Sequence, residues 1–195
     1  MAWASTSPLV KTYTLEEFWE LPEPSDRSKL ELIAGVLYMT PAPGQSHHNA
    51  VSRLNRILTD YLIRTDNQGP LYFPRAGIIR GPNSWLEPDL FYIAPETQAQ
   101  GPFDPKYPQY LTTADLVIEV ISPNSALYDR NTKADTYAAL GVKELWLVDE
   151  SSGIIEMRVL EDDRYTRSIV LERDDYLKSI VLPEFELRVG SVFGS

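Results

Sequence analysis

Cysteine is missing from this chain of 195 residues, and histidine occurs only twice. The lack of cysteine excludes disulfides and thiolate metal sites, and it is compatible with a cytosolic environment. The two histidines, His47 and His48, are adjacent and therefore lack the spacing of a zinc-binding cluster. A Gly-x-Ser-x-Gly turn is missing as well, so a small-molecule hydrolase of the serine or zinc type is disfavoured.

Positive charge and long apolar runs are also scarce. The 18 lysine and arginine residues face 28 acidic residues, which gives a formal net charge of −10. So acidic a chain binds a phosphate backbone poorly without sequence-specific contacts, and any nucleic-acid role requires a local basic groove. No run reaches transmembrane length, and residues 1–14 lack the apolar core of a signal peptide. We therefore expect a cytoplasmic protein without a membrane segment.

Hydrophobic residues make up 43% of the chain, which is enough to bury one core. We expect a flexible arm over residues 1–11 and a single α/β domain over residues 12–195. A capping box formed by Thr14 and Glu17 predicts a short first helix. Further predicted elements, in chain order, are a strand or hairpin (30–40), a helix (47–63), two strands (71–80 and 87–93), an irregular excursion (94–114), a strand (116–121), a helix (126–140) closed by Gly141, a strand (144–150) and a hairpin (154–160 and 164–171).

The segment LVIEVISP, residues 116–123, is a β-branched run typical of a central strand that is covered on both faces. The helix and strand that follow it complete a βαβ pattern, which implies a parallel pair. Glu119 has the same strand parity as Val117 and Ile121, so its side chain points into a packed layer. A buried carboxylate without a partner costs several kcal/mol. A cation, a proton or hydrogen-bond donors must therefore lie close to Glu119.

Asp89 repeats this anomaly in the segment EPDLFYI. It shares strand parity with Phe91 and Ile93, so a second carboxylate lies on an apolar face of a predicted strand. Two such acids in neighbouring strands would repel each other and raise a pKa unless a divalent cation lay between them. Hard oxygen ligands of this kind suit Mg²⁺ or Mn²⁺.

Lys133 falls about two turns into the helix that follows the Glu119 strand. Ala134, Tyr137 and Ala138 mark the buried stripe of this helix, and Lys133 lies roughly 40° from Tyr137 at about 100° per residue. Lys133 therefore flanks the core and can reach over the end of the Glu119 strand. Two carboxylates, a metal ion and an ammonium group are the groups needed to hold a scissile phosphate, orient a water and neutralise developing charge.

The order of Asp89 in EPDL, Glu119 in VIEVISP and Lys133 in YDRNTK resembles the PD-(D/E)XK nuclease superfamily. More narrowly, the chain resembles a large family of proposed restriction endonucleases, long labelled a domain of unknown function and abundant in cyanobacteria. The likeness extends from TLEEF through ELIAGVLYMTPAP to GVKELWLVD. One position departs from the superfamily pattern: Ile121 stands where the core signature has its lysine. In the family that this chain resembles, the following helix supplies the lysine instead, which matches Lys133.

This resemblance implies a restriction-endonuclease-like core, in which helices flank a central mixed β-sheet and a β-hairpin region lies near the C-terminus. It implies that Asp89, Glu119 and the main-chain carbonyl of Val120 ligate Mg²⁺ or Mn²⁺. Lys133 would orient the attacking water and stabilise the transition state. Each residue also has a structural alternative: Asp89 could close a turn, Glu119 could pair with an arginine, and Lys133 could form a surface ion pair with Asp129.

Two further residues match family positions. Glu31 matches an acidic residue that such folds bring from an early element, where it would hold a second ion or a metal-bound water. It could equally be an exposed strand acid. His47 is a candidate phosphate contact, although it could simply flank the helix start. Additional candidate contacts to the substrate backbone are Arg53, Arg56, Arg75 and Arg80.

The leading hypothesis is a metal-dependent endonuclease that hydrolyses phosphodiester bonds in DNA by in-line attack of water. Cleavage of a duplex usually needs two active sites, so we expect a homodimer, without an organic cofactor or a membrane partner. The alternative is a catalytically silent protein of the same fold that serves as a binding or assembly module. Binding of Mn²⁺ or Mg²⁺ that is lost in Asp89→Ala would favour the enzyme.

Overall fold

The structure is a computed structural model that describes residues 11–73, 76–79, 81–121 and 128–194. Nearly all of the predicted N-terminal arm lies outside these ranges. None of the helices within them combines the length and the apolarity that a membrane span requires. The helical elements are α1 (Leu15–Trp19), α2 (Gln45–Arg64), η1 (Gly81–Asn83), α3 (Pro95–Ala99), η2 (Asp129–Lys133), α5 (Ala134–Ala139) and α6 (Gly190–Phe193).

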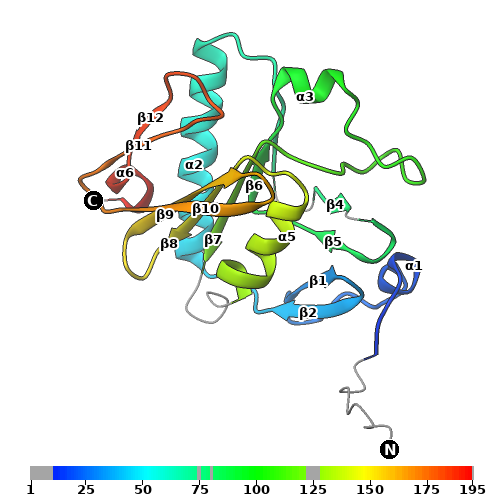
Figure 1. Cartoon of the computed structure of the whole chain (residues 1–195). Helices are drawn as coiled ribbons and strands as arrows, with labels where there is room; N and C mark the ends of the chain where they lie inside the picture. The colour runs from blue at the N-terminus through cyan, green and yellow to red at the C-terminus, as the bar shows by residue number, and fades with distance from the viewer. Residues whose placement is uncertain (1–10, 74–75, 80, 122–127, 195) are drawn as a thin grey trace, which may run out of the picture.

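A six-stranded mixed sheet forms the centre of the fold, in the order β10-β9-β8-β7-β6-β3 (Figure 1). Its strands are β3 (Leu71–Tyr72), β6 (Leu90–Tyr92), β7 (Leu116–Ile121), β8 (Glu144–Asp149), β9 (Ile154–Glu161) and β10 (Arg164–Leu171). β7 and β8 run parallel, and the other neighbouring strands are antiparallel. The predicted central mixed sheet, the parallel pair and the β9–β10 hairpin are therefore confirmed.

Every residue of β7 is buried, because helices cover both faces of the sheet. Ile118 and Val120 pack in the hydrophobic cluster that α2 contributes to, together with Leu54 of that helix. Val117 and Ile121 pack in the opposite cluster, which contains buried residues of α5. Figure 1 shows α2 and α5 on opposite sides of the sheet. The parity assigned to β7 from the sequence is therefore confirmed, and it directs Glu119 to the α5 face.

A smaller antiparallel sheet, in the order β2-β1-β5-β4, lies beside the central one. Its strands are β1 (Lys29–Ile33), β2 (Val36–Thr40), β4 (Ile78–Ile79) and β5 (Trp85–Leu86). Ala34 and Gly35 form the two-residue loop between β1 and β2 with φ values of 50° and 81°. Such loops require positive φ at both positions, which glycine adopts without strain. The hairpin expected over residues 30–40 is confirmed, and it carries Glu31.

Several expected elements differ in extent from the observed ones. Residues 71–80, predicted as one strand, contribute two short strands to two different sheets, and residues 87–93 contribute only the three-residue β6. The excursion over residues 94–114 begins with the short helix α3, because Pro95 fits the first turn of a helix, where its missing N–H has no partner to lose. Beyond the predicted hairpin, β11 (Tyr176–Lys178) and β12 (Glu186–Arg188) form another.

Two helix boundaries were predicted more closely. The capping box at Thr14 is present, with hydrogen bonds in both directions between Thr14 and Glu17. The helix expected over residues 126–140 begins, within the described residues, near the π-turn η2 and continues as α5; residues 126 and 127 lie outside the described ranges. Gly141 follows it with φ of 78°, the left-handed conformation expected of a glycine that ends a helix.

Candidate active site

Asp89 lies directly before β6, where the neighbouring strand holds its carboxylate in place. Its Oδ2 accepts a hydrogen bond from the main-chain N–H of Val120 at 2.8 Å, and His47 Nε2 lies 3.0 Å from the same oxygen. Its Oδ1 has no hydrogen bond or ion pair with a described residue. Burial raises the pKa of Asp89, but the contact with His47 and the charge of Lys29 outweigh burial and hold it below its ordinary value. Asp89 is therefore an ionised carboxylate with one oxygen available to a ligand.

Glu119 projects from β7 into the layer between the sheet and α5. Its Oε1 accepts a hydrogen bond of 2.5 Å from the Tyr137 hydroxyl and lies 2.6 Å from Lys133 Nζ. Within the described ranges, Oε2 has neither kind of contact. Burial raises the pKa of Glu119 to about 7, against the opposing charge of Lys133. A further cation beside Oε2 would favour the ionised form of Glu119.

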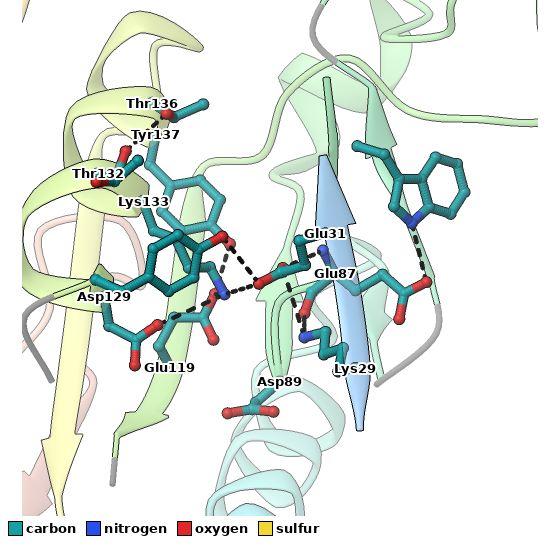
Figure 2. Close-up of polar contacts among 12 residues, drawn as sticks. Lys29, Glu31, Glu87, Asp89, Glu119, Asp129, Thr132, Lys133, Thr136 and Tyr137 are labelled. Carbon is teal, nitrogen blue, oxygen red and sulfur yellow. Dashed lines mark hydrogen bonds and ion pairs between the residues drawn. The ribbon is translucent and has the colours of Figure 1, made fainter. Parts of the chain in front are cut away.

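Lys133 is the last residue of η2, a π-turn of the kind that often marks a functional site. Lys133 and Tyr137 are four residues apart and share a helix face, so both reach Glu119. Lys133 Nζ also lies 3.1 Å from Glu31 Oε2 and 3.9 Å from Asp129 Oδ1 (Figure 2). Burial lowers the pKa of Lys133, but these carboxylates outweigh burial and raise it well above 10.5. Lys133 is thus a buried ammonium group whose charged form is favoured by the surrounding carboxylates.

Glu31 reaches the same ammonium group from β1, in the smaller sheet. Its Oε1 accepts a hydrogen bond of 2.9 Å from the main-chain N–H of Glu87 and lies 3.6 Å from Lys29 Nζ. Its Oε2 accepts a hydrogen bond of 3.3 Å from the Tyr128 hydroxyl, in addition to the contact with Lys133. Burial raises the pKa of Glu31, but the charges of Lys133 and Lys29 hold it below its ordinary value. Both oxygens of Glu31 are therefore already engaged.

A cavity of about 460 Å³ opens beside these groups, bounded by residues 40–44 and the start of α2. Its acidic lining residues are Glu31, Asp89, Glu119, Asp129 and Glu150, and its lysines are Lys29 and Lys133. The carboxylates outnumber the ammonium groups, so the cavity repels a phosphate and attracts a divalent cation. Asp89 and Glu119 are buried acids that could hold such a cation, because each has one oxygen without another partner among the described residues.

The donor set fits a hard ion that retains part of its water shell. Among the described residues, no group of three or more His, Asp or Glu side chains converges as a ready metal site. Mg²⁺ commonly binds through one or two carboxylates and keeps several waters, whereas a structural zinc site needs four protein ligands. Two carboxylates at an open cavity are therefore suited to Mg²⁺ or Mn²⁺.

The structure brings together most of the residues that the sequence singles out. Asp89, Glu119, Lys133, Glu31 and His47 all line the cavity. His47 lies in the first turn of α2, and its Nδ1 is buried without a hydrogen-bond partner in the described part of the chain. Glu31, for which an exposed strand position was an alternative, is buried.

Other predicted contacts are placed differently or are not described. Arg53 does not line the cavity, because its Nη1 donates a hydrogen bond of 3.2 Å to the carbonyl of Val192 in α6. Arg56 is exposed on α2, while Arg75 and Arg80 lie outside the described residues. The main-chain N–H of Val120 holds Asp89, and a metal contact through the Val120 carbonyl stays a prediction.

Sequence reasoning missed several partners of the site. Tyr137 was interpreted as a core residue, yet its hydroxyl contacts Glu119. The pair of Asp129 and Lys133 was considered as a surface ion pair, but both side chains are buried. Glu119 has a lysine partner, not the arginine considered from the sequence. The spacing of Tyr137 four residues after Lys133 was the available signal, since both had to face the same strand.

Known proteins share this architecture. A solved structure described as a "putative nuclease belonging to DUF820" from Anabaena variabilis ATCC 29413 matches with a TM-score of 0.72 and 18% sequence identity, over 93% of this chain and 97% of that chain. At this identity the likeness shows the fold alone, which is a mixed α/β fold with a central mixed sheet. The model of the Uma2 family, described as "Putative restriction endonuclease", matches residues 15–190. The chain belongs to this family, as its motifs predicted. A comparison with curated proteins found no match.

Proposed function

We propose that this protein is a metal-dependent endonuclease that hydrolyses phosphodiester bonds in DNA. The observation that carries the proposal is the buried ammonium group of Lys133, which lies 2.6 Å from Glu119 at a cavity that Asp89 also lines. A buried lysine among acids can be purely structural. Here, however, two of the acids each have one oxygen without a contact to any described residue at a cavity, and the chain belongs to a family described as "Putative restriction endonuclease".

The ion that suits this site is Mg²⁺ or Mn²⁺, held by Asp89, Glu119 and, as the family resemblance implies, the carbonyl of Val120. When bound, such an ion polarises phosphate oxygens and lowers the pKa of water. His47 fixes the orientation of Asp89 through the contact at Oδ2, which leaves Oδ1 directed away from that contact. The excess of acidic groups supports a cation requirement, because a phosphate would otherwise be repelled from the cavity.

Lys133 serves as a charged donor in this proposal. Its pKa lies well above the ordinary lysine value, so it does not accept a proton at neutral pH. A charged ammonium group can orient the attacking water and neutralise charge that develops on the phosphate oxygens. Glu119 and Glu31 hold this donor at a defined place, since both lie within ion-pair distance of Nζ. His47 also lines the cavity, but its Nε2 contacts Asp89 and its Nδ1 is buried, so its role in this proposal is to hold Asp89.

For a DNA endonuclease we propose ion-dependent binding of DNA and assembly as a homodimer. A formal charge of −10 makes long-range attraction of DNA weak, so we expect binding that depends strongly on salt and on the divalent ion. A homodimer would supply the two sites that double-strand cleavage needs. We place this reaction in the cytoplasm, where the lack of cysteine is unremarkable.

Calorimetry and plasmid nicking test the proposal together. We expect wild-type protein to bind Mn²⁺ and to nick supercoiled plasmid only when Mn²⁺ or Mg²⁺ is present. Asp89→Ala should lose Mn²⁺ binding and nicking, because one of two carboxylate ligands is removed. Asp163→Ala is the matched control, since Asp163 is a highly exposed acid away from the cavity. Unchanged Mn²⁺ binding in Asp89→Ala would instead indicate a catalytically silent binding or assembly module.

A further inference from the structure

Glu31 differs from Asp89 and Glu119 in what its oxygens already contact. Both oxygens of Glu31 have partners, namely the N–H of Glu87 at 2.9 Å on Oε1 and Lys133 Nζ at 3.1 Å on Oε2, with further contacts to Lys29 and Tyr128. A metal ion at Glu31 would have to displace donors that Glu31 already holds, among them the buried ammonium group of Lys133. We infer that Glu31 is a positioning residue that fixes the Lys133 ammonium group, and that it is not a metal ligand.

A second acid, Glu31, is needed to hold the Lys133 ammonium group in one place. Lysine has a flexible stem and three rotatable donors, so one carboxylate does not define its place. Figure 2 shows Lys133 Nζ between the carboxylates of Glu31 and Glu119, with Asp89 apart from this network. If Glu119 were the sole partner, the ammonium group would compete with a cation for that carboxylate. Glu31 provides a contact that remains when Glu119 turns one oxygen to a cation.

Glu31 is itself held rigidly by the smaller sheet. Lys29 Nζ donates a hydrogen bond to the carbonyl of Glu87, and the N–H of Glu87 donates to Glu31, so β1 is tied to the segment that leads into Asp89. On the other side, Tyr128 contacts Glu31 through its hydroxyl and stacks on Tyr38 with ring centroids 4.6 Å apart. The position of the Lys133 ammonium group is therefore fixed by contacts from the smaller sheet as well as from β7.

The ion pair can be tested without any metal, by measuring urea unfolding of Glu31→Gln, Lys133→Met and the double variant. Lys133→Met leaves two buried carboxylates without their ammonium group, so it should be the least stable of the three. Adding Glu31→Gln should restore part of that stability, with a coupling of at least about tenfold in the unfolding equilibrium constant. Glu144→Gln is the control, because Glu144 is a buried strand acid whose hydrogen bonds with described residues include no lysine, and its effect should add to that of Lys133→Met. Additive effects of Glu31→Gln and Lys133→Met would overturn the inference.

The catalytic consequence rests on the proposed function and is tested by calorimetry and kinetics. Glu31→Gln should keep Mn²⁺ binding within about fivefold of wild type, while kcat for nicking falls at least about tenfold with KM nearly unchanged. This experiment uses only Glu31→Gln, so it does not depend on whether Lys133→Met folds. Loss of Mn²⁺ binding equal to that of Asp89→Ala would make Glu31 a ligand and overturn the inference. If wild-type protein binds no Mn²⁺, the proposed metal dependence fails, and the unfolding measurements alone decide the role of Glu31.

Discussion

Buried acids lie in two places around the parallel strands β7 and β8, at the end where the strands begin and at the cavity, and the two groups differ in what they contact. At the end where the strands begin, Asp115 directly precedes β7 and Glu144 opens β8. Further along β7, Glu119 lines the cavity together with Asp89. All four acids are buried. Burial alone therefore does not separate a structural acid from a candidate site acid.

The acids at the starting end have a partner on every oxygen. Glu144 Oε1 accepts from Trp146 Nε1 at 2.5 Å, and Oε2 accepts from the hydroxyl of Ser179 and the N–H groups of Ile180 and Val181. Asp115 similarly accepts from the N–H of Ala94, from Thr97 and from Lys143. Each acid fastens a remote loop to the sheet, and neither has an oxygen to offer to a ligand.

The comparison shows that an unsatisfied oxygen at a cavity, more than burial or parity, distinguishes the candidate site. Glu144 shares strand parity with Trp146 and Val148, which are core residues. The argument that singles out Glu119 from the sequence therefore applies equally to Glu144. What separates them is that Glu119 Oε2 has no partner among the described residues, whereas both oxygens of Glu144 are occupied.

The largest effect that would test this comparison is on catalysis. Glu119→Gln should reduce the nicking rate at least about 1,000-fold, because it removes a charged oxygen that would ligate the proposed ion. The free energy of unfolding should change by less than about 2 kcal/mol, since Lys133 keeps its contact with Glu31. Plasmid nicking and urea unfolding on the same preparation measure both quantities. A variant that unfolds easily but still cleaves would place Glu119 with the structural acids.

Glu144→Ala should show the reverse pattern. It leaves the buried Trp146 indole and the N–H group of Ile180 without their acceptor, which should cost about 2–3 kcal/mol of stability. The nicking rate per folded molecule should stay within about twofold of wild type, because Glu144 does not line the cavity. Urea unfolding and nicking under native conditions check this. A large loss of activity in folded protein would contradict the division into two kinds of acid.

The smallest expected effect is on the stability of a variant at Asp149. This acid lies near the cavity, but its contacts resemble those of the structural acids. Asp149 accepts hydrogen bonds from Ser151, Ser152 and Arg130, and although burial raises its pKa, these contacts lower it to about 2. A folded-state pKa below the unfolded value of 3.8 means that the stabilisation is present above that value and is lost as the pH falls toward 2.

Asp149→Asn should therefore be about 1–2 kcal/mol less stable than wild type at about pH 6. The difference should shrink as the pH falls through the interval between the unfolded and folded pKa values. Urea unfolding at a series of pH values measures this dependence. A stability difference that does not vary with pH would mean that ionisation of Asp149 contributes nothing.

Local sequence patterns predicted the parts of the fold that depend on short-range preferences. Alternation along residues 116–121 placed Glu119 on a buried face, and helical spacing placed Lys133 where it could reach over that strand. The same patterns failed for residues 71–80, which divide between two sheets. Strand pairing there depends on remote segments, and two-residue strands leave too little alternation to reveal it.

By itself the sequence determined the family, the mixed α/β fold and the elements that carry Glu119 and Lys133, whereas Asp89, predicted within a strand, lies directly before β6. Only the tertiary structure decided that Glu31 meets the same ammonium group, and that Tyr137 contacts Glu119. The physical reason is that burial and parity are set by neighbours along the chain, whereas hydrogen-bond partners come from distant segments. Which acid keeps an oxygen free is therefore settled only when the two sheets and the helix pack together.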